Sequence, residues 1–210
     1  MMFLQPNEPF PPVSLADDQG CLAFSFDLSL TRLIEAYQKG IFPWYNEDEP
    51  VIWWSPDPRM VLFPDELKVS KSMKKVLRDN IFHITYNQDF AQVIQACRSM
   101  PREGQDGTWI TDEIITYYQH LHNLGLAHSV EVWNKNKQLV GGLYGVWIKR
   151  VFCGESMFAK ESNASKAGFI SFVQKHADDL DIIDCQIYTK HLASLGARLI
   201  PRDAYLKYLA

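Results

Sequence analysis

The run Gly141-Gly142-Leu143-Tyr144-Gly145-Val146 decides the fold of this chain, together with its continuation through Phe152-Cys153-Gly154-Glu155-Ser156-Met157-Phe158 to Asn163-Ala164-Ser165-Lys166. It predicts two strands, a turn and the start of a helix. The strands are apolar, aromatic and glycine-rich where an ordinary hairpin would alternate. Glycines inside strands usually mark bulges, or places where another backbone or a ligand comes close. We therefore expect such a bulge or close approach here.

One carboxylate, Glu155, stands in this run among Phe152, Met157 and Phe158. A charged group in apolar surroundings is costly unless it is hydrogen-bonded or has a function. Glu155 is therefore either a structural acceptor of hydrogen bonds or part of a reactive site, and both interpretations stay open at this point.

Composition sets the class of protein. The 210 residues suffice for one large or two small domains, and 47% hydrophobic residues allow a sizeable core. No apolar run approaches the roughly 20 residues of a membrane helix, and residues 1–12 lack the pattern of a secretory signal. We expect no membrane association. The net charge of −4 means that any nucleic-acid contact must use a local basic patch.

Metal and disulfide chemistry are not expected. The four cysteines lie far apart without C-x-x-C spacing, which is typical of reduced, buried thiols in the cytoplasm. His120 and His122 are two apart on a predicted helix and so do not share a face, while His128 and His191 stand alone. Each of these last two is expected to be a satisfied core or surface histidine. Nothing in the sequence calls for a metal or a cofactor.

Residues 1–66 form one predicted unit, a small α/β domain, and residues 67–210 form another. In the first, helical spacing with Ser29 as N-cap predicts a helix from Leu28 to Lys39. Residues 42–45 and 53–59 hold so many prolines that we expect irregular structure there, packed as an aromatic layer. This layer is either a core made by loops or the wall of a ligand pocket.

The second unit has a distinctive order of elements. From residue 81 the pattern predicts strand, helix, helix, three strands, helix, strand, helix and strand, with a loop over 101–107, Asn87 capping the first helix and Thr111 opening the second. A mixed sheet with helices on both faces follows, which makes the fold α+β. This order resembles the acetyltransferase-like fold of the GNAT superfamily. Members that bind acyl-CoA carry a Gly-rich loop after the central strand. The corresponding residues 160–166 of this chain contain no glycine, which argues against CoA binding.

A basic stripe lies near the start of this unit. In a predicted helix over 70–80 the cations fall at i, i+3, i+4 and i+7, namely Lys71, Lys74, Lys75 and Arg78. Such stripes are commonly solvated faces. This one has no interleaved acid before Asp79, which also suits a phosphate partner.

Asp184 and Gln186 lie two apart on a predicted strand, so their side chains should share a face. A carboxylate and an amide there are either a strand-end pair that satisfies loop amides or a functional pair. In the second case Asp184 would orient the Gln186 carbonyl toward an attacking amine.

Several blocks now coincide with one family: Phe42-Pro43-Trp44, residues 53–59, Gly107-Thr108-Trp109-Ile110, residues 128–133, residues 141–158, Asn163-Ala164-Ser165-Lys166 and Ile183-Asp184-Cys185-Gln186. In this order, from about residue 20 to 205, the chain closely resembles leucyl/phenylalanyl-tRNA–protein transferase. The resemblance implies a small N-terminal domain and a GNAT-like domain. It also implies transfer of Leu or Phe, less well Met, from aminoacyl-tRNA to a protein with N-terminal Arg or Lys, which creates an N-degron for proteolysis.

The resemblance also assigns residues. Leu143, Phe152, Met157, Phe172 and Ile183 would line an apolar pocket for the amino-acid side chain. Trp44 and Trp109 would bound the aminoacyl-adenosine site with Tyr118 nearby, and the catalytic group would be Glu155, Asp184 and Gln186. The basic stripe would hold acceptor-stem phosphates. A cytoplasmic monomer is expected.

Two other functions fit parts of the sequence. One is a CoA-dependent N-acyltransferase, which the absent Gly-rich loop disfavours. The other is a non-catalytic aminoacyl-tRNA-binding module, which the presence of Glu155, Asp184 and Gln186 disfavours.

Overall fold

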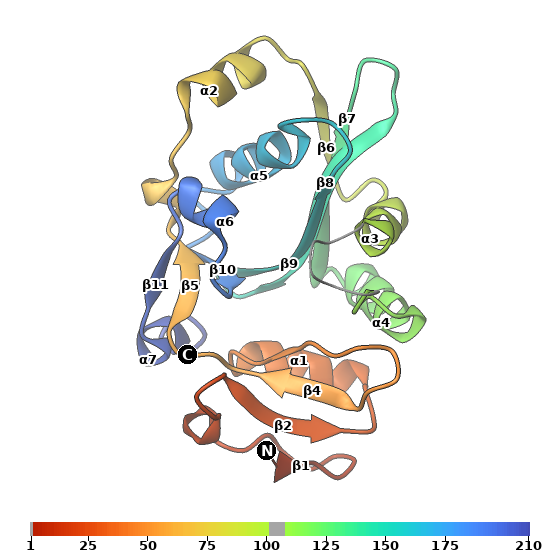
Figure 1. Cartoon of the computed structure of the whole chain (residues 1–210), viewed down its shortest axis with the longest axis vertical. Helices are drawn as coiled ribbons and strands as arrows, with labels where there is room; N and C mark the ends of the chain where they lie inside the picture. Colours follow the sequence, from red (N-terminus) through yellow and green to blue (C-terminus); the bar gives the residue numbers. More distant parts are fainter. Residues whose placement is uncertain (1, 101–107) are drawn as a thin grey trace.

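Two β-sheets organise the chain in the computed structural model, which describes residues 2–100 and 108–210 (Figure 1). The smaller sheet has the order β1-β2-β4-β3. Its strands are β1 (Met2–Phe3), β2 (Cys21–Ser25), β3 (Phe42–Pro43) and β4 (Val51–Trp54). The 3₁₀ turn η1 (Val13–Leu15) precedes β2, and α1 (Leu30–Gln38) lies between this sheet and the rest of the molecule (Figure 1).

The larger sheet has the order β11-β5-β10-β9-β8-β7-β6. Its strands are β5 (Arg59–Leu62), β6 (His83–Tyr86), β7 (Ala127–Trp133), β8 (Leu139–Ile148), β9 (Val151–Ala159), β10 (Ile182–Gln186) and β11 (Arg198–Ile200). Only β9 and β10 pair in parallel; the other neighbours are antiparallel. The sheet is therefore mixed, as the sequence predicted.

Helices cover both faces of the larger sheet (Figure 1). On one face lies α5 (Ala164–Lys175), and on the other lie α3 (Phe90–Ser99) and α4 (Asp112–Asn123). The remaining helical segments are η2 (Pro64–Glu66), α2 (Lys71–Arg78), α6 (Lys190–Ser194) and α7 (Arg202–Leu206). The predicted α+β class, with helices on both sides of a mixed sheet, is confirmed.

Helix starts follow from side-chain caps, which satisfy free backbone N–H groups. Ser29 accepts the N–H of Arg32, and Thr111 accepts that of Ile114, as predicted. The cap of α3 was predicted wrongly. Asp89, not Asn87, accepts a helix N–H, because Asn87 has a left-handed backbone (φ 56°) and binds the N–H of Ser129 instead.

Two glycines of β8 are required by close approaches. A Cβ on Gly145 would lie 2.2 Å from the carbonyl oxygen of Cys153, and one on Gly141 would lie 2.7 Å from the Cβ of Ala164. The register between β8 and β9 also shifts between Tyr144 and Gly145. The bulge and the close backbone contact predicted for the glycine-rich run are both confirmed.

The prediction of irregular structure over 42–45 and 53–59 holds for residues 44–45 and 55–58 and is wrong for the others. Phe42–Pro43 is β3, residues 53 and 54 end β4, and Arg59 begins β5. Proline did not prevent this, because Pro43 sits on an edge strand and Pro56 and Pro58 fall between strands. The indole of Trp54 donates to the carbonyl of Trp44 at 2.7 Å and ties the aromatic segments together.

β5 precedes the predicted domain boundary between residues 66 and 67, yet it pairs with β10 and β11 of the larger sheet. The boundary itself stays a prediction. The predicted loop over 101–107 lies outside the described residues. None of the helices in the described part of the chain is long and apolar enough to cross a membrane.

Candidate active site

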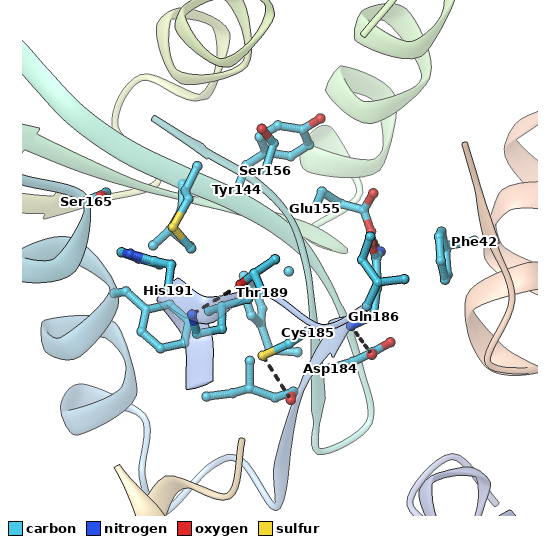
Figure 2. Close-up of a pocket in the computed structure, with 18 of the residues that line it drawn as sticks. Phe42, Tyr144, Glu155, Ser156, Ser165, Asp184, Cys185, Gln186, Thr189 and His191 are labelled. Atoms are coloured by element: carbon cyan, nitrogen blue, oxygen red, sulfur yellow. Dashed lines mark hydrogen bonds between the residues drawn. The ribbon is translucent and has the colours of Figure 1, made fainter. Parts of the chain in front are cut away.

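A cavity opens where β9 and β10 part. Their pairing ends at Cys153 and Asp184, although β9 runs on to Ala159 and β10 to Gln186. A cavity of about 450 Å³ lies beyond this point, lined by both strand ends (Figure 2). The parallel pairing of β9 with β10 therefore makes room for the site by stopping short.

The cavity walls are mainly apolar. Of the side-chain pocket predicted from the resemblance, four members line the cavity: Leu143, Phe152, Met157 and Ile183. Trp44 and Trp109, expected to bound the adenosine, line it as well, together with Phe42. The sequence did not point to Phe169, which also lines the cavity.

Two of the residues that the resemblance assigned to the site lie behind the cavity wall. The ring of Phe172 is 4.4 Å from that of Phe152, so it supports the wall without being part of it. Tyr118 is fully buried on α4, and its hydroxyl donates to Glu155 Oε2 at 3.1 Å. Tyr118 in turn shares a short hydrogen bond with Tyr37 of α1.

Glu155 lies at the centre of the site (Figure 2). Its Oε1 accepts the side-chain N–H of Gln186 at 2.9 Å, and its Oε2 accepts Tyr118. Removal from water raises the pKa of Glu155 from 4.5 to about 7, against the lowering effect of the tyrosine hydrogen bonds. The carboxylate can therefore exchange a proton near neutral pH.

Asp184 is buried and bound on all sides. Arg59 donates to both carboxylate oxygens, from Nε at 2.8 Å and from Nη2 at 2.6 Å. Tyr205 donates its hydroxyl to Oδ2 at 2.9 Å, and the backbone N–H of Gln186 donates to Oδ1 at 2.9 Å. Asp184 and Arg59 are each 1% exposed, so this ion pair is out of water.

The expected same-face pairing of Asp184 and Gln186 side chains does not hold. The register with β5 shifts between these residues, and Gln186 has a left-handed backbone with φ of 62°. Strict alternation fails at such a bulge. The two residues meet through the Gln186 backbone, and the Gln186 side chain turns to Glu155 instead (Figure 2).

Two nearby groups were misjudged or missed by sequence reasoning. His191 was expected to be satisfied, but its Nε2 is buried at the cavity wall with no hydrogen bond to the described residues. Cys185 also lines the cavity, and burial raises the pKa of its thiol well above the usual range. A thiol that stays protonated is a poor nucleophile.

The basic stripe lies apart from the cavity. Lys71, Lys74, Lys75 and Arg78 are exposed on α2, and none of them lines the cavity. The opposite side of α2 places Met73 in the core. A partner bound there would contact the molecule at a second place.

The fold and the site define an α+β protein of the acyl-transfer type. An apolar cavity fits the acyl group, and a carboxylate with a pKa of about 7 stands ready to accept a proton.

Comparisons with known proteins give the family. The family model for leucyl/phenylalanyl-tRNA protein transferase matches residues 61–210, and the model for the N-terminal domain of that transferase matches residues 26–57. Curated proteins named leucyl/phenylalanyl-tRNA–protein transferase include one from Christiangramia forsetii, 60% identical over 100% of both chains. Another, from Flavobacterium johnsoniae, is 54% identical and covers 95% of this chain and 94% of its own.

A solved structure described as a GCN5-related N-acetyltransferase-like protein from Streptococcus suis aligns with a TM-score of 0.41 at 15% identity, over 85% of this chain and 67% of that chain. The family models and the curated relatives settle the membership: this chain belongs to the leucyl/phenylalanyl-tRNA–protein transferase family.

The raised pKa of Glu155 predicts a titration near neutral pH. Carboxyl ¹³C NMR of labelled protein should give a Glu155 midpoint of about 7. Since the folded pKa exceeds that of the unfolded chain, stability from this proton is present below about pH 4.5 and is lost as pH rises through about 7. Tyr118→Phe should move the midpoint upward, because it removes a hydrogen bond to the charged form.

Tyr117→Phe is the matched control, because Tyr117 is on the same helix and has no hydrogen bond to Glu155. A Glu155 midpoint near 4.5 in the wild-type protein would contradict the assignment.

Proposed function

We propose that this protein transfers Leu or Phe, and less well Met, from aminoacyl-tRNA to the N-terminal Arg or Lys of acceptor proteins. The product would be an N-degron that directs the acceptor to proteolysis. The observation that carries the proposal is the arrangement of the cavity. Glu155 and Gln186 line the same cavity as a set of apolar side chains and two tryptophans, within a chain of this family.

The apolar compartment would bind the side chain of the donor amino acid. Leu143, Phe152, Met157 and Ile183 offer only apolar contact there. Burial of one methylene group contributes about 0.8 kcal/mol to binding. The larger side chain of Leu would therefore bind more favourably than that of Ala by a few times this amount. Branching at Cβ must be rejected by shape.

Trp44 and Trp109 would hold the 3′-terminal adenosine. Stacking of a base on an aromatic ring contributes roughly 1–3 kcal/mol and requires no reading of sequence. Phe42 adds a third ring to this side of the cavity. Such a contact would accept any tRNA that carries the right amino acid.

The chemistry would be direct aminolysis of the ester. The α-amino nitrogen of the acceptor attacks the ester carbonyl carbon, the new C–N bond forms, and the bond to the ribose 3′ oxygen breaks. Glu155 would accept the proton that the amine loses, and the 3′ oxygen takes up a proton as the tRNA leaves. Because the ester is already activated, positioning is the main task of the protein.

Gln186 would orient the amine. Its side-chain N–H groups point to Glu155, which leaves its carbonyl oxygen as an acceptor for an amine N–H. An amide is a very weak base, so orientation is its part in the reaction. We further propose a monomer, and a cytoplasmic location because all four cysteines are buried and none forms a disulfide.

One transfer assay tests the function. Leu-tRNA and a peptide with N-terminal Arg are incubated with the protein, and mass spectrometry should find one Leu added at the peptide N-terminus. RNase treatment of the donor should abolish the product, and a peptide with N-terminal Glu should stay unmodified. Transfer of acetyl from acetyl-CoA with no transfer of Leu would overturn the proposal.

Met157→Ala should blunt the choice among donor side chains. The truncation enlarges the apolar compartment, so the Leu-to-Phe ratio of kcat/KM should change by about tenfold. Met73→Ala is the control: it removes a methionine from the core outside the cavity and should leave the ratio alone. An unchanged ratio in Met157→Ala would remove Met157 from the pocket.

The basic stripe predicts a selective loss of tRNA binding. Changing Lys74 and Lys75 together to Glu should weaken binding of any aminoacyl-tRNA and lower its salt dependence by a slope of roughly one per lost phosphate contact. Transfer from a 3′-aminoacyl adenosine should be spared, because this donor has no stem.

The matched control changes Lys135 and Lys137, which are exposed in the turn between β7 and β8, to Glu. Equal impairment of tRNA and minimal donor in the Lys74/Lys75 variant would mean that the stripe is structural. No impairment of either would leave it a solvated face.

A further inference from the structure

Asp184 has no capacity left for a substrate. Its two oxygens together accept four hydrogen bonds, from Arg59 Nε, Arg59 Nη2, the Tyr205 hydroxyl and the Gln186 backbone N–H. Two carboxylate oxygens offer about four acceptor positions, so each is in use. A group in this state can fix its neighbours but cannot take up a proton from an amine without losing a partner.

Arg59 is held by the carboxylate and by two aromatic rings, while its Nη1 is buried with no hydrogen bond to the described residues. Its guanidinium carbon lies 4.8 Å from the ring centre of Phe42 and 4.9 Å from that of Tyr205. Phe42 belongs to β3 of the smaller sheet and Tyr205 to α7, so segments from both ends of the chain contact the same guanidinium. Planar stacking with a bidentate carboxylate contact leaves little rotational freedom.

Gln186 depends on this arrangement for its conformation. A glutamine with φ of 62° is in the left-handed region, which non-glycine residues rarely occupy without local support. The support is the hydrogen bond from its backbone N–H to Asp184 Oδ1 at 2.9 Å. With the backbone held this way, the side-chain amide reaches Glu155 at 2.9 Å.

We propose that Arg59 and Tyr205 are positioning residues of the transfer reaction, which act through Asp184 to lock Gln186 in the conformation that presents its amide to Glu155. This inference rests on the proposed function for its kinetic part. Neither residue lines the cavity. The C-terminal helix α7 thereby becomes part of the site through a single hydroxyl.

Tyr205→Phe is the decisive variant, because it removes the hydroxyl and keeps the ring that stacks on Arg59. The matched control is Tyr208→Phe, the same change three residues away, where the ring packs on Phe63. In Tyr205→Phe, hydrogen exchange of the Gln186 backbone amide, followed by NMR, should become about tenfold faster.

The second measurement is steady-state transfer over a range of Leu-tRNA and acceptor-peptide concentrations. The rate in Tyr205→Phe should fall roughly 10- to 100-fold, as expected when a reacting group loses its fixed position, with the KM of both substrates within about twofold of wild type. Tyr208→Phe should match the wild type in both measurements. Arg59→Lys keeps the charge but cannot bind both oxygens side by side, and should resemble Tyr205→Phe.

The two measurements separate the possible failures. Wild-type exchange and wild-type rates in Tyr205→Phe would overturn the inference, even if the variant melted at a lower temperature. If the wild-type protein transferred no amino acid at all, the proposed function would fail. The exchange of the Gln186 amide would then still decide whether Tyr205 holds this residue in place.

Discussion

The ion pair between Arg59 and Asp184 is the interaction on which the site depends. It joins β5 to β10, and the rings of Phe42 and Tyr205 bring β3 and α7 to the same point. Burial of two charges carries a desolvation cost that an ion pair often fails to recover, so stability alone is a weak explanation for it. A fixed arrangement of the groups around Gln186 is a better one, because a fully bonded carboxylate admits only one geometry.

The cavity exists because the sheet is interrupted at a defined place. Gly145 lets β8 approach the backbone of β9, and the bulge beside it shifts the register. On the other side, β10 leaves its parallel partner after Asp184 and bulges against β5. Strands that part within a sheet expose backbone and side chains to a shared space, and here that space receives Glu155 and Gln186.

Much of this followed from the sequence where the signal was local. Ser29 and Thr111 marked helix starts because a side-chain cap acts within one turn, and the glycines of β8 marked a close approach because no other residue fits. Strands β3, β4 and β5 were missed because sheet position decides whether proline is tolerated. Arg59 and Tyr205 were not singled out, because Arg59 lies 125 residues and Tyr205 lies 21 residues from Asp184 along the chain.

The resemblance placed Glu155, Asp184 and Gln186 in one site, and the structure brings them together; their roles stay a proposal. What sequence reasoning could not supply was the direction of each side chain. Period-two alternation put Asp184 and Gln186 side by side, but the left-handed backbone at Gln186 breaks that period. A bulge depends on long-range pairing, so no local pattern could have indicated it.

The two carboxylates of the site illustrate how environment divides roles. Asp184 has a guanidinium as partner and every acceptor position filled, so its position is fixed. Glu155 receives hydrogen bonds from neutral groups only, Tyr118 and Gln186, and burial together with the nearby negative charge of Asp184 raises its pKa to about 7. Carboxylates whose environments differ in this way commonly serve different functions. The charge that holds Gln186 in place thus also raises the pKa of Glu155, so Asp184 acts on both residues that the proposed reaction uses.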